Sequence, residues 1–325
     1  MHPMTKTLSP RLVLLAALVG STAQGLVAQS GTKQDNTAYG STSAEFLLLG
    51  AGARGTALGG AYTAIANDVS ALYYNPAGAA LMTRPGVMVG TYDYVADTRY
   101  SWGGIAFPFG GGSKTFGVQV GTFGFKDQPI YTAEQPDGTG ATYDVSETFV
   151  GLSYAQNFSD RFSAGVTAKY VSDNLGDVTG QALAVDFGTN FHAALNGHPV
   201  KFSFVLSNLG TNVSYNGNAL NGGITRDQPA GEDPVASVPQ PSRFRTKAFP
   251  LPTTFRVGLA YDMLTSASNR LTVLSDFNQP NNSKAGFSGG MEWSSRNLGG
   301  SPFSAAIRGS YSYYAANNIK PSTLP

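Results

Sequence analysis

The chain after residue 85 is dominated by segments in which apolar and polar residues alternate, each ending in a turn. Between Phe162 and Tyr170 every second residue is apolar, and the intervening residues are Ser163, Gly165, Thr167 and Lys169. A period of two is the signature of a β-strand, whose successive side chains point to opposite faces. Eleven strands are predicted, at residues 86–95, 98–108, 113–126, 143–158, 161–173, 179–192, 199–207, 251–263, 270–278, 285–295 and 302–314.

The predicted strands are long. Strands of soluble proteins usually run about five or six residues, whereas a tilted strand needs about 9–11 residues to cross a bilayer. Aromatic residues recur near the segment ends, as in the girdles of membrane barrels; they include Tyr92, Tyr94, Phe158, Tyr170 and Tyr313. The pattern predicts an all-β fold, a transmembrane antiparallel outer-membrane β-barrel. A soluble β-sandwich is the alternative, but it explains the alternation and not the strand length.

The strand count has a parity problem. Turns after even-numbered segments are mostly short and those after odd-numbered segments are longer on average, including the loops at 127–142 and 208–250. Outer-membrane barrels combine short periplasmic turns with long outer loops and have an even number of strands. Eleven visible strands therefore mean that one strand is hidden or that the closing strands are missing. We expect a barrel over residues 85–325, truncated at its C-terminus, with three absent strands and about fourteen in total.

Composition narrows the class of protein. Charged residues make up 13% of the chain, the mean hydropathy is −0.10, and 40 of the 325 residues are glycine. Such a chain has too little charge for a disordered tail and no apolar run long enough for membrane helices. The formal net charge of +1 does not indicate the strongly basic surface that is typical of nucleic-acid-binding proteins. The absence of cysteine excludes disulfides, thiolate metal sites and cysteine nucleophiles.

The N-terminus resembles a secretory signal peptide over residues 1–28. Lys6 and Arg11 form a basic region, Leu12–Val19 an apolar core, and small residues follow, so cleavage is expected after Ala23 or Ala28. A single membrane anchor is the alternative, but the apolar run is short for a span. An exported chain with barrel-like strands predicts location in the bacterial outer membrane.

Residues 29–84 do not alternate and are predicted to form a small helical hatch, or plug, inside the barrel. Small residues dominate residues 50–61, Asn67-Asp68 is a turn or cap signal, and Asn75-Pro76 ends a short helix. The residues that define this hatch motif are Arg54, Gly59, Gly60, Asn67, Asp68, Asn75, Pro76, Ala77 and Gly78.

Residues 50–82 of this region, a stretch of about 35 residues, resemble the N-terminal signature of the PorV/PorQ family of outer-membrane proteins. That family is related to the FadL-like barrels. The resemblance implies a fourteen-stranded barrel with an N-terminal hatch. It also implies a binding or shuttle role in type IX protein secretion and in attaching cargo to the cell surface. The chain departs from the family at the C-terminus, where closing strands are not visible.

Two further groups of residues are candidates for function. Six charged residues lie on polar strand faces, where they belong to a hydrated lumen or to a polar network that holds the hatch; they are Lys169, Asp186, Arg256, Asp262, Glu292 and Arg308. The loop at 208–250 is an external loop or a docking site for a partner. Its candidate contact residues are Arg243, Phe244, Arg245, Lys247 and Phe249.

No catalytic constellation, metal-ligand spacing or cofactor motif stands out, so we expect no enzyme activity, no metal and no cofactor. Gly50-x-Gly52-x-x-Gly55 matches a dinucleotide fingerprint only in letters, because Gly59-Gly60 interrupts the helix that the motif needs. Two functions remain. One is the secretion role, with translocon or attachment proteins and exported cargo as partners; the predicted polar lumen favours it. The other is a FadL-like channel for hydrophobic molecules such as fatty acids. Outer-membrane lipid is a partner in both.

Overall fold

A computed structural model of the protein describes residues 40–224, 240–297 and 303–314. The predicted signal peptide at 1–28 lies outside these residues. The chain divides into two units, Met1–Thr37 and Ala38–Pro325, and everything below concerns the second unit.

The hatch region contains short helices, and the rest of the described chain is mostly strand. The helices are η1 (Glu45–Leu48), α2 (Ala53–Ala57), α3 (Ala71–Tyr74), η2 (Pro76–Leu81) and η3 (Asn218–Leu220). The strands are β1 (Gly86–Asp93), β2 (Arg99–Phe109), β3 (Lys114–Pro129), β4 (Thr142–Ser159), β5 (Phe162–Leu175), β6 (Val178–Leu195), β7 (His198–Gly210), β8 (Tyr215–Gly217), β9 (Asn221–Ile224), β10 (Gln240–Arg243), β11 (Thr254–Thr265), β12 (Asn269–Pro280), β13 (Gly286–Ser295) and β14 (Ala305–Tyr314). No helix among the described residues has the length and apolar character needed to cross a membrane.

Eleven strands form one continuous antiparallel sheet, which we call the wall. Its order is β1-β2-β3-β4-β5-β6-β7-β11-β12-β13-β14, so chain neighbours pair throughout, apart from the step from β7 to β11. Each of the eleven predicted segments overlaps one of these strands, which confirms the predicted all-β antiparallel fold. Within the described residues, β1 and β14 are the two edges of the wall. The three further strands belong to the long loop: β8 pairs with β6, and β9 pairs with β10.

The wall has an apolar outer face and a polar inner face. On β6, Leu183 and Phe187 are 62% and 49% exposed, whereas Asp186 and Asn190 are fully buried. On β5, Tyr170 is 44% exposed and its neighbour Lys169 only 3%. A soluble sandwich would bury the apolar face, so this inversion argues against the sandwich and for a wall that faces lipid.

Connection lengths mostly follow the predicted alternation. One end of the wall carries 110–113, 160–161, 196–197 and 266–268, and the other carries 94–98, 130–141, 176–177, 211–253 and 281–285. Two connections break the rule, because 176–177 is a two-residue turn among the loops and 296–304 is long among the turns. We call the end with 130–141 and 211–253 the long-loop end.

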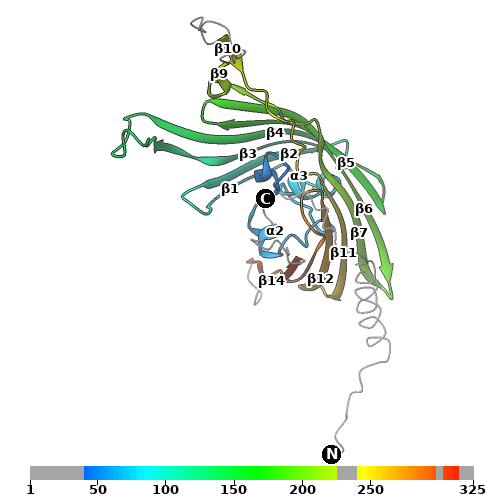
Figure 1. Cartoon of the computed structure of the whole chain (residues 1–325). Coiled ribbons are helices and arrows are strands. Elements are labelled where there is room, and N and C mark those ends of the chain that lie inside the picture. The colour runs from blue at the N-terminus through cyan, green and yellow to red at the C-terminus, as the bar shows by residue number, and fades with distance from the viewer. Residues whose placement is uncertain (1–39, 225–239, 298–302, 315–325) are drawn as a thin grey trace, which may run out of the picture. The chain divides into compact units, whose positions relative to one another are not determined.

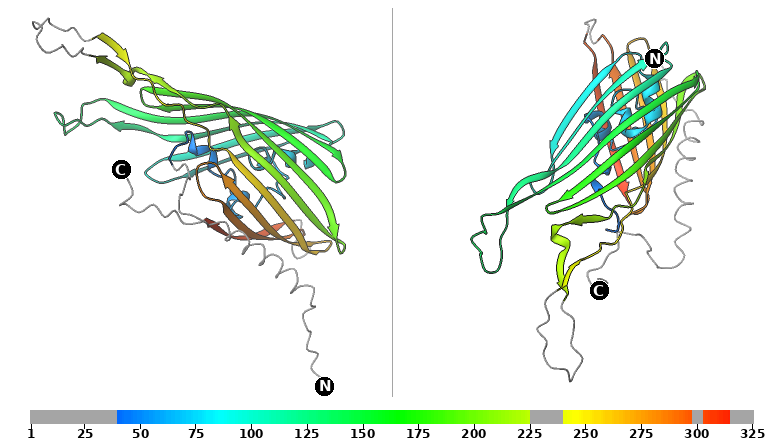
Figure 2. Two further views of the ribbon diagram at one scale, coloured as in Figure 1. Left: turned by 45° about the vertical axis from the view of Figure 1, so that its right-hand side comes forward. Right: turned by 90° about the horizontal axis from the view of Figure 1, so that it is seen from above.

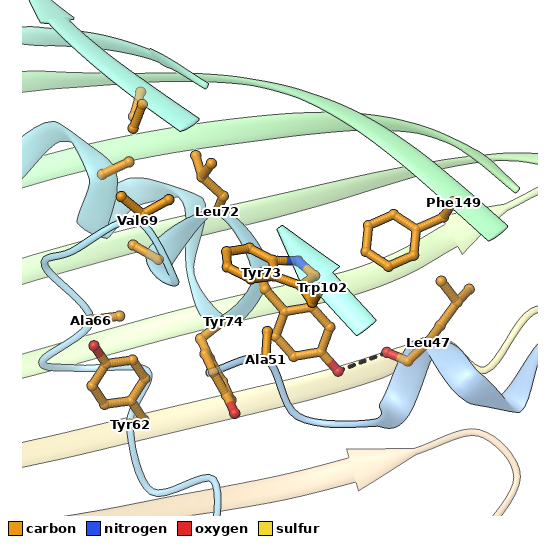
Figure 3. Close-up of a cluster of buried hydrophobic side chains, with 14 of the residues drawn as sticks. Leu47, Ala51, Tyr62, Ala66, Val69, Leu72, Tyr73, Tyr74, Trp102 and Phe149 are labelled. Atoms are coloured by element: carbon orange, nitrogen blue, oxygen red, sulfur yellow. Dashed lines mark hydrogen bonds between the residues drawn. The ribbon is translucent and has the colours of Figure 1, made fainter. Parts of the chain in front are cut away.

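The wall curves around the described part of the hatch, as Figures 1 and 2 show. The largest buried cluster lies between the two, where Leu72, Tyr73 and Tyr74 of the hatch lie near Trp102 and Phe149 of the wall (Figure 3). Hydrogen bonds also link the wall to the hatch here. The indole of Trp102 donates to Gln119 at 3.0 Å, and the Gln119 amide in turn donates to the Leu72 carbonyl of the hatch at 2.7 Å. The core of this unit is therefore the hatch–wall interface, not the interior of a sandwich.

Candidate functional site

The Asn75-Pro76-Ala77-Gly78 motif is seated on glycines of the wall. A Cβ added to Gly188 on β6 would lie 2.1 Å from the Asn75 Oδ1, and one added to Gly165 on β5 would lie 2.5 Å from the Pro76 carbonyl carbon. Contacts that close need a residue without a side chain. The wall is therefore shaped to receive this turn of the hatch.

Asn75 holds the turn together. Its Oδ1 accepts from the Ala77 N–H at 3.1 Å and caps η2, with Pro76 at the first helical position. Its amide donates to the Thr63 carbonyl at 2.9 Å and reaches the Thr189 carbonyl of β6 at 3.3 Å. The side chain is fully buried, so one residue caps a helix, braces the hatch and attaches it to the wall.

A charge network attaches α2 to the wall. The Arg54 guanidinium forms a bidentate pair with Glu292 of β13, with both N···O distances 2.9 Å. Arg54 also donates to Asn67 at 2.8 Å and lies 3.3 Å from Asp68. Arg308 of β14 donates to the same Glu292 carboxylate at 2.6 Å. The structure thus brings together residues that the sequence placed in two separate groups.

Electrostatics keeps this network ionised on the hatch side. Burial lowers the pKa of Arg54, but the hydrogen bond to Glu292 and the charges of Tyr62, Glu292 and Asp68 together outweigh burial, and the net pKa is raised. The guanidinium therefore stays charged. Glu292 is 2% exposed at its side chain, and two guanidinium partners satisfy a carboxylate that would otherwise be costly to bury.

Gly59 and Gly60 form a turn against β14. Both have positive φ, +61° and +81°, a region that favours glycine. The Ser312 hydroxyl donates to the Gly59 carbonyl, and the Ser310 hydroxyl donates to the Ala57 carbonyl, each at 3.0 Å. This half of the hatch is attached by polar contacts.

Thr63 makes a third attachment that the sequence did not indicate. Its hydroxyl donates to Asp276 of β12 at 2.6 Å and lies 2.8 Å from the Ser203 hydroxyl of β7. Both Thr63 and Asp276 are buried. No spacing or motif marks Thr63, because its partners are more than a hundred residues away in the sequence.

The remaining polar candidates behave differently from one another. Lys169 pairs with Asp186 at 2.6 Å, donates to Asn208 at 2.9 Å and lies over the Phe149 ring. Asp262 accepts from the Thr272 hydroxyl at 2.6 Å. The side chain of Arg256 makes no hydrogen bond or ion pair to any described residue, although its charge acts on the Asp276 carboxylate of β12. Lys169 and Asp262 therefore have polar partners within the protein, whereas the Arg256 side chain does not form such a contact.

Arg256 lines a cavity of about 380 Å³ between the hatch and strands β11 to β14. Leu48, Tyr73 and Tyr74 form its hatch side, and Asn278 lies beside Arg256 on the wall. In Figure 3, the Tyr73 hydroxyl donates to the Leu47 carbonyl at 2.9 Å, which fixes one ring of the lining. A volume of this size is within the range of small-ligand pockets.

The candidate contact residues of the long loop lie on its surface. Arg243 belongs to β10 and donates to Asn221 of β9 at 3.1 Å, and Phe244 is 68% exposed. Arg245 and Lys247 are exposed too. Phe249 instead pairs with Val213 through two backbone hydrogen bonds, so it belongs to the base of the loop. No three His, Asp or Glu side chains of the described residues are placed to hold a metal ion.

Fold and site define a class: an antiparallel β-wall with an apolar outer face, filled by an N-terminal hatch. The chain belongs to the UPF0164 family, described as an uncharacterised protein family, which matches residues 18–264. A search of curated proteins finds no match. Among solved structures, the chain is similar to the Ralstonia pickettii toluene transporter TbuX, at 14% identity and a TM-score of 0.43, over 83% of this chain and 87% of that one. It is also similar to the CymD monoaromatic hydrocarbon channel, at 12% identity and a TM-score of 0.40, over 82% and 94% of the two chains.

Proposed function

We propose that the protein is an outer-membrane β-barrel that passes small, largely apolar molecules through a lumen gated by its hatch. The observation that carries the proposal is the cavity of about 380 Å³ between hatch and wall. The outward apolar face supports a position in lipid, because charged or polar side chains are costly there and the large exposed side chains of the wall strands include many Leu, Phe, Val and Tyr residues.

The part of the hatch that we expect to move is residues 49–60. In this half only Ala51, Gly55 and Leu58 are buried, whereas residues 61–80 are buried apart from Asn67 and Asp68. Segments with few buried apolar contacts open at lower free-energy cost. The same half supplies several residues of the cavity lining, so its displacement would enlarge the cavity.

A disulfide lock tests the gating. An ideal Cβ on Gly59 lies 3.3 Å from the Ser310 Cβ, close to the spacing of a disulfide, and the chain has no other cysteine. In cells expressing Gly59→Cys with Ser310→Cys, we expect oxidation to block uptake of a labelled apolar probe and reduction to restore it. Since the two states share the same sequence, strain from the positive φ of Gly59 cancels in the comparison.

Two controls frame the result. A cysteine pair at Ser153 and Thr167, whose hydroxyls lie 2.7 Å apart on β4 and β5, adds a disulfide within the wall and should leave uptake unchanged. A pair at Thr63 and Ser203 locks the buried half of the hatch and should have little effect. Equal uptake in the oxidised and reduced Gly59–Ser310 variant would refute gating by residues 49–60.

A second candidate is the binding role in type IX secretion that the PorV/PorQ resemblance implies. The long loop favours it, because an exposed aromatic residue, Phe244, lies beside Arg243 and Arg245, and aromatic residues and arginine are enriched at protein interfaces. Lys247 adds a further positive charge nearby. Pull-down from detergent-extracted outer membranes, with wild type and Phe244→Ala, tests it. Recovery of translocon or attachment proteins only with wild type supports the role, and their absence from both refutes it.

A further inference from the structure

Four arginine residues line a second, open pocket at the end of the wall opposite the long-loop end. The pocket has a volume of about 480 Å³ and is lined by Arg54 of the hatch, Arg270 of β12, Arg308 of β14 and Arg296, which directly follows β13. Glu292 is the one acidic residue among the described residues of the lining. The neighbouring sequence 298–302 contains no acidic residue either. The pocket therefore carries an excess of positive charge.

Glu292 does not neutralise this excess, because its carboxylate is already engaged. It accepts two hydrogen bonds from Arg54 and one from the Nε of Arg308, at 2.6 Å. The two terminal nitrogens of Arg308 donate to no described residue. Arg308 can therefore keep its bond to Glu292 and still donate to a ligand.

Arg270 and Arg296 have no carboxylate partner. Within the described residues neither guanidinium forms an ion pair. The acid on the strand beside β12, Asp262, faces Thr272 in the wall register and accepts from its hydroxyl at 2.6 Å. A guanidinium is always charged and presents five N–H donors, and like charges in one pocket repel one another. An anion bound between these side chains would satisfy the donors and remove the repulsion.

The wall register brings the donors to one face of the sheet. Arg270 of β12 is opposite Ser294 of β13, and Arg308 of β14 is opposite Glu292. Residues 292 and 294 are two positions apart and so point to the same face. Strands β12 and β14 are two strand spacings apart, roughly 10 Å. The Ser294 hydroxyl, on the strand between them, forms no hydrogen bond to a described residue.

The rest of the lining indicates what kind of anion fits. Besides the arginines and Glu292 it consists of one asparagine, three serines and two alanines, so no large apolar side chain is present to hold an acyl chain. Arginine matches the oxygens of a phosphate group in a bidentate manner. Two guanidinium groups without a carboxylate partner can balance the two negative charges of a phosphate.

We propose that this pocket binds a phosphate group, whose oxygens accept from Arg270, Arg296 and the terminal nitrogens of Arg308, with the Ser294 hydroxyl as a further donor. The pocket shares no lining residue with the cavity of about 380 Å³. The inference therefore goes beyond the proposed passage of apolar molecules and does not depend on it.

Equilibrium dialysis tests the inference. The full-length protein in dodecyl maltoside, a detergent without phosphate, is dialysed at low salt against radiolabelled orthophosphate. Wild type should show a single saturable site. Arg270→Gln and Arg296→Gln should each weaken binding roughly tenfold or more, as expected for loss of a charged hydrogen bond. Arg270→Lys should retain part of the affinity, because lysine keeps the charge and lacks the fork.

Competition distinguishes a free phosphate from a lipid headgroup. Soluble dihexanoyl phosphatidate should displace orthophosphate no better than glycerol phosphate does, because the lining offers no apolar surface. Stronger displacement by the phosphatidate would still support a phosphate site and would identify a lipid headgroup as its source. Displacement by neither compound overturns the inference.

Arg99→Gln is the matched control, because Arg99 is an exposed arginine that pairs with Asp93 and lies outside the pocket. Its phosphate affinity should equal that of wild type. The gel mobility of unheated protein confirms that each variant is folded, and Arg296→Gln, a change at an exposed residue, serves if Arg270→Gln does not fold. The inference is overturned if folded wild type shows no saturable binding. It is overturned equally if Arg99→Gln weakens binding as much as Arg296→Gln, since the attraction would then be non-specific.

Discussion

Replacing Lys169 by Met tests how much a single buried ion pair contributes to the wall. The side chains of Lys169 and Asp186 are 2% and 0% exposed and lie 2.6 Å apart. Removal of the ammonium leaves the Asp186 carboxylate buried, with one remaining donor, the backbone N–H of Asn208 at 2.8 Å. Breaking a buried pair in this way costs about 3–5 kcal/mol.

A cost of that size lowers the folding equilibrium constant by roughly two to four orders of magnitude, at about 1.4 kcal/mol for each factor of ten. The assay is urea unfolding of the protein in lipid vesicles, followed by the mobility shift between folded and heat-denatured protein on gels. The double variant Lys169→Met with Asp186→Asn removes both charges, and its amide oxygen can still accept from Asn208. We expect it to recover most of the lost free energy of unfolding.

Arg99→Met provides the comparison for an exposed pair. Arg99 and Asp93 form an ion pair at 2.8 Å, but their side chains are 66% and 76% exposed, and such pairs contribute at most about 1 kcal/mol. The reasoning is refuted if Lys169→Met costs no more than Arg99→Met. It is refuted equally if the double variant is no more stable than Lys169→Met alone.

Three further substitutions test other parts of the structure. Gly188→Val places a side chain against the Asn75 turn and should cost about 1–3 kcal/mol in the same unfolding assay, whereas Gly90→Val, with open space at its Cβ, should not. Arg54→Met should speed hydrogen exchange of the α2 amides, measured by mass spectrometry, and leave exchange of the η2 amides unchanged. Equal protection of the α2 amides in wild type and Arg54→Met would contradict the role of the charge network. Phe187→Lys on the outer face should cost roughly 2–4 kcal/mol if that face meets lipid, while Phe187→Leu stays near wild type; tolerance of the lysine would place the face in water.

The wall could be predicted from the sequence because each strand carries its own signal. Alternation is local, so Phe187 and Asp186 reveal opposite faces without knowledge of their neighbours. Which face is buried was also predictable, from strand length and low charge. The short strands β8 to β10 in the long loop were not predicted, because segments of three or four residues have no measurable period.

The hydrogen bonds and ion pairs between hatch and wall could not be predicted from the sequence in the same way. Asn75 and Arg54 were recognised as members of a motif, but their wall partners lie far away in sequence, 238 positions in the case of Glu292. Thr63 carries no motif at all, and it is tied to Asp276 over 213 positions. Such pairs depend on how strands register against one another, and a single sequence does not specify that register.

Charge balance shows what geometry adds to the sequence. The polar candidates on the wall comprise three cations and three acids, which in principle pair completely. In the structure the hatch supplies Arg54 as a second cation for Glu292, and Asp262 is satisfied by Thr272. Arg256 and Asp262 share β11 but lie six residues apart, roughly 20 Å along a strand. That separation keeps them from pairing, so Asp262 does not neutralise the Arg256 guanidinium at the cavity that Arg256 lines between the hatch and strands β11 to β14.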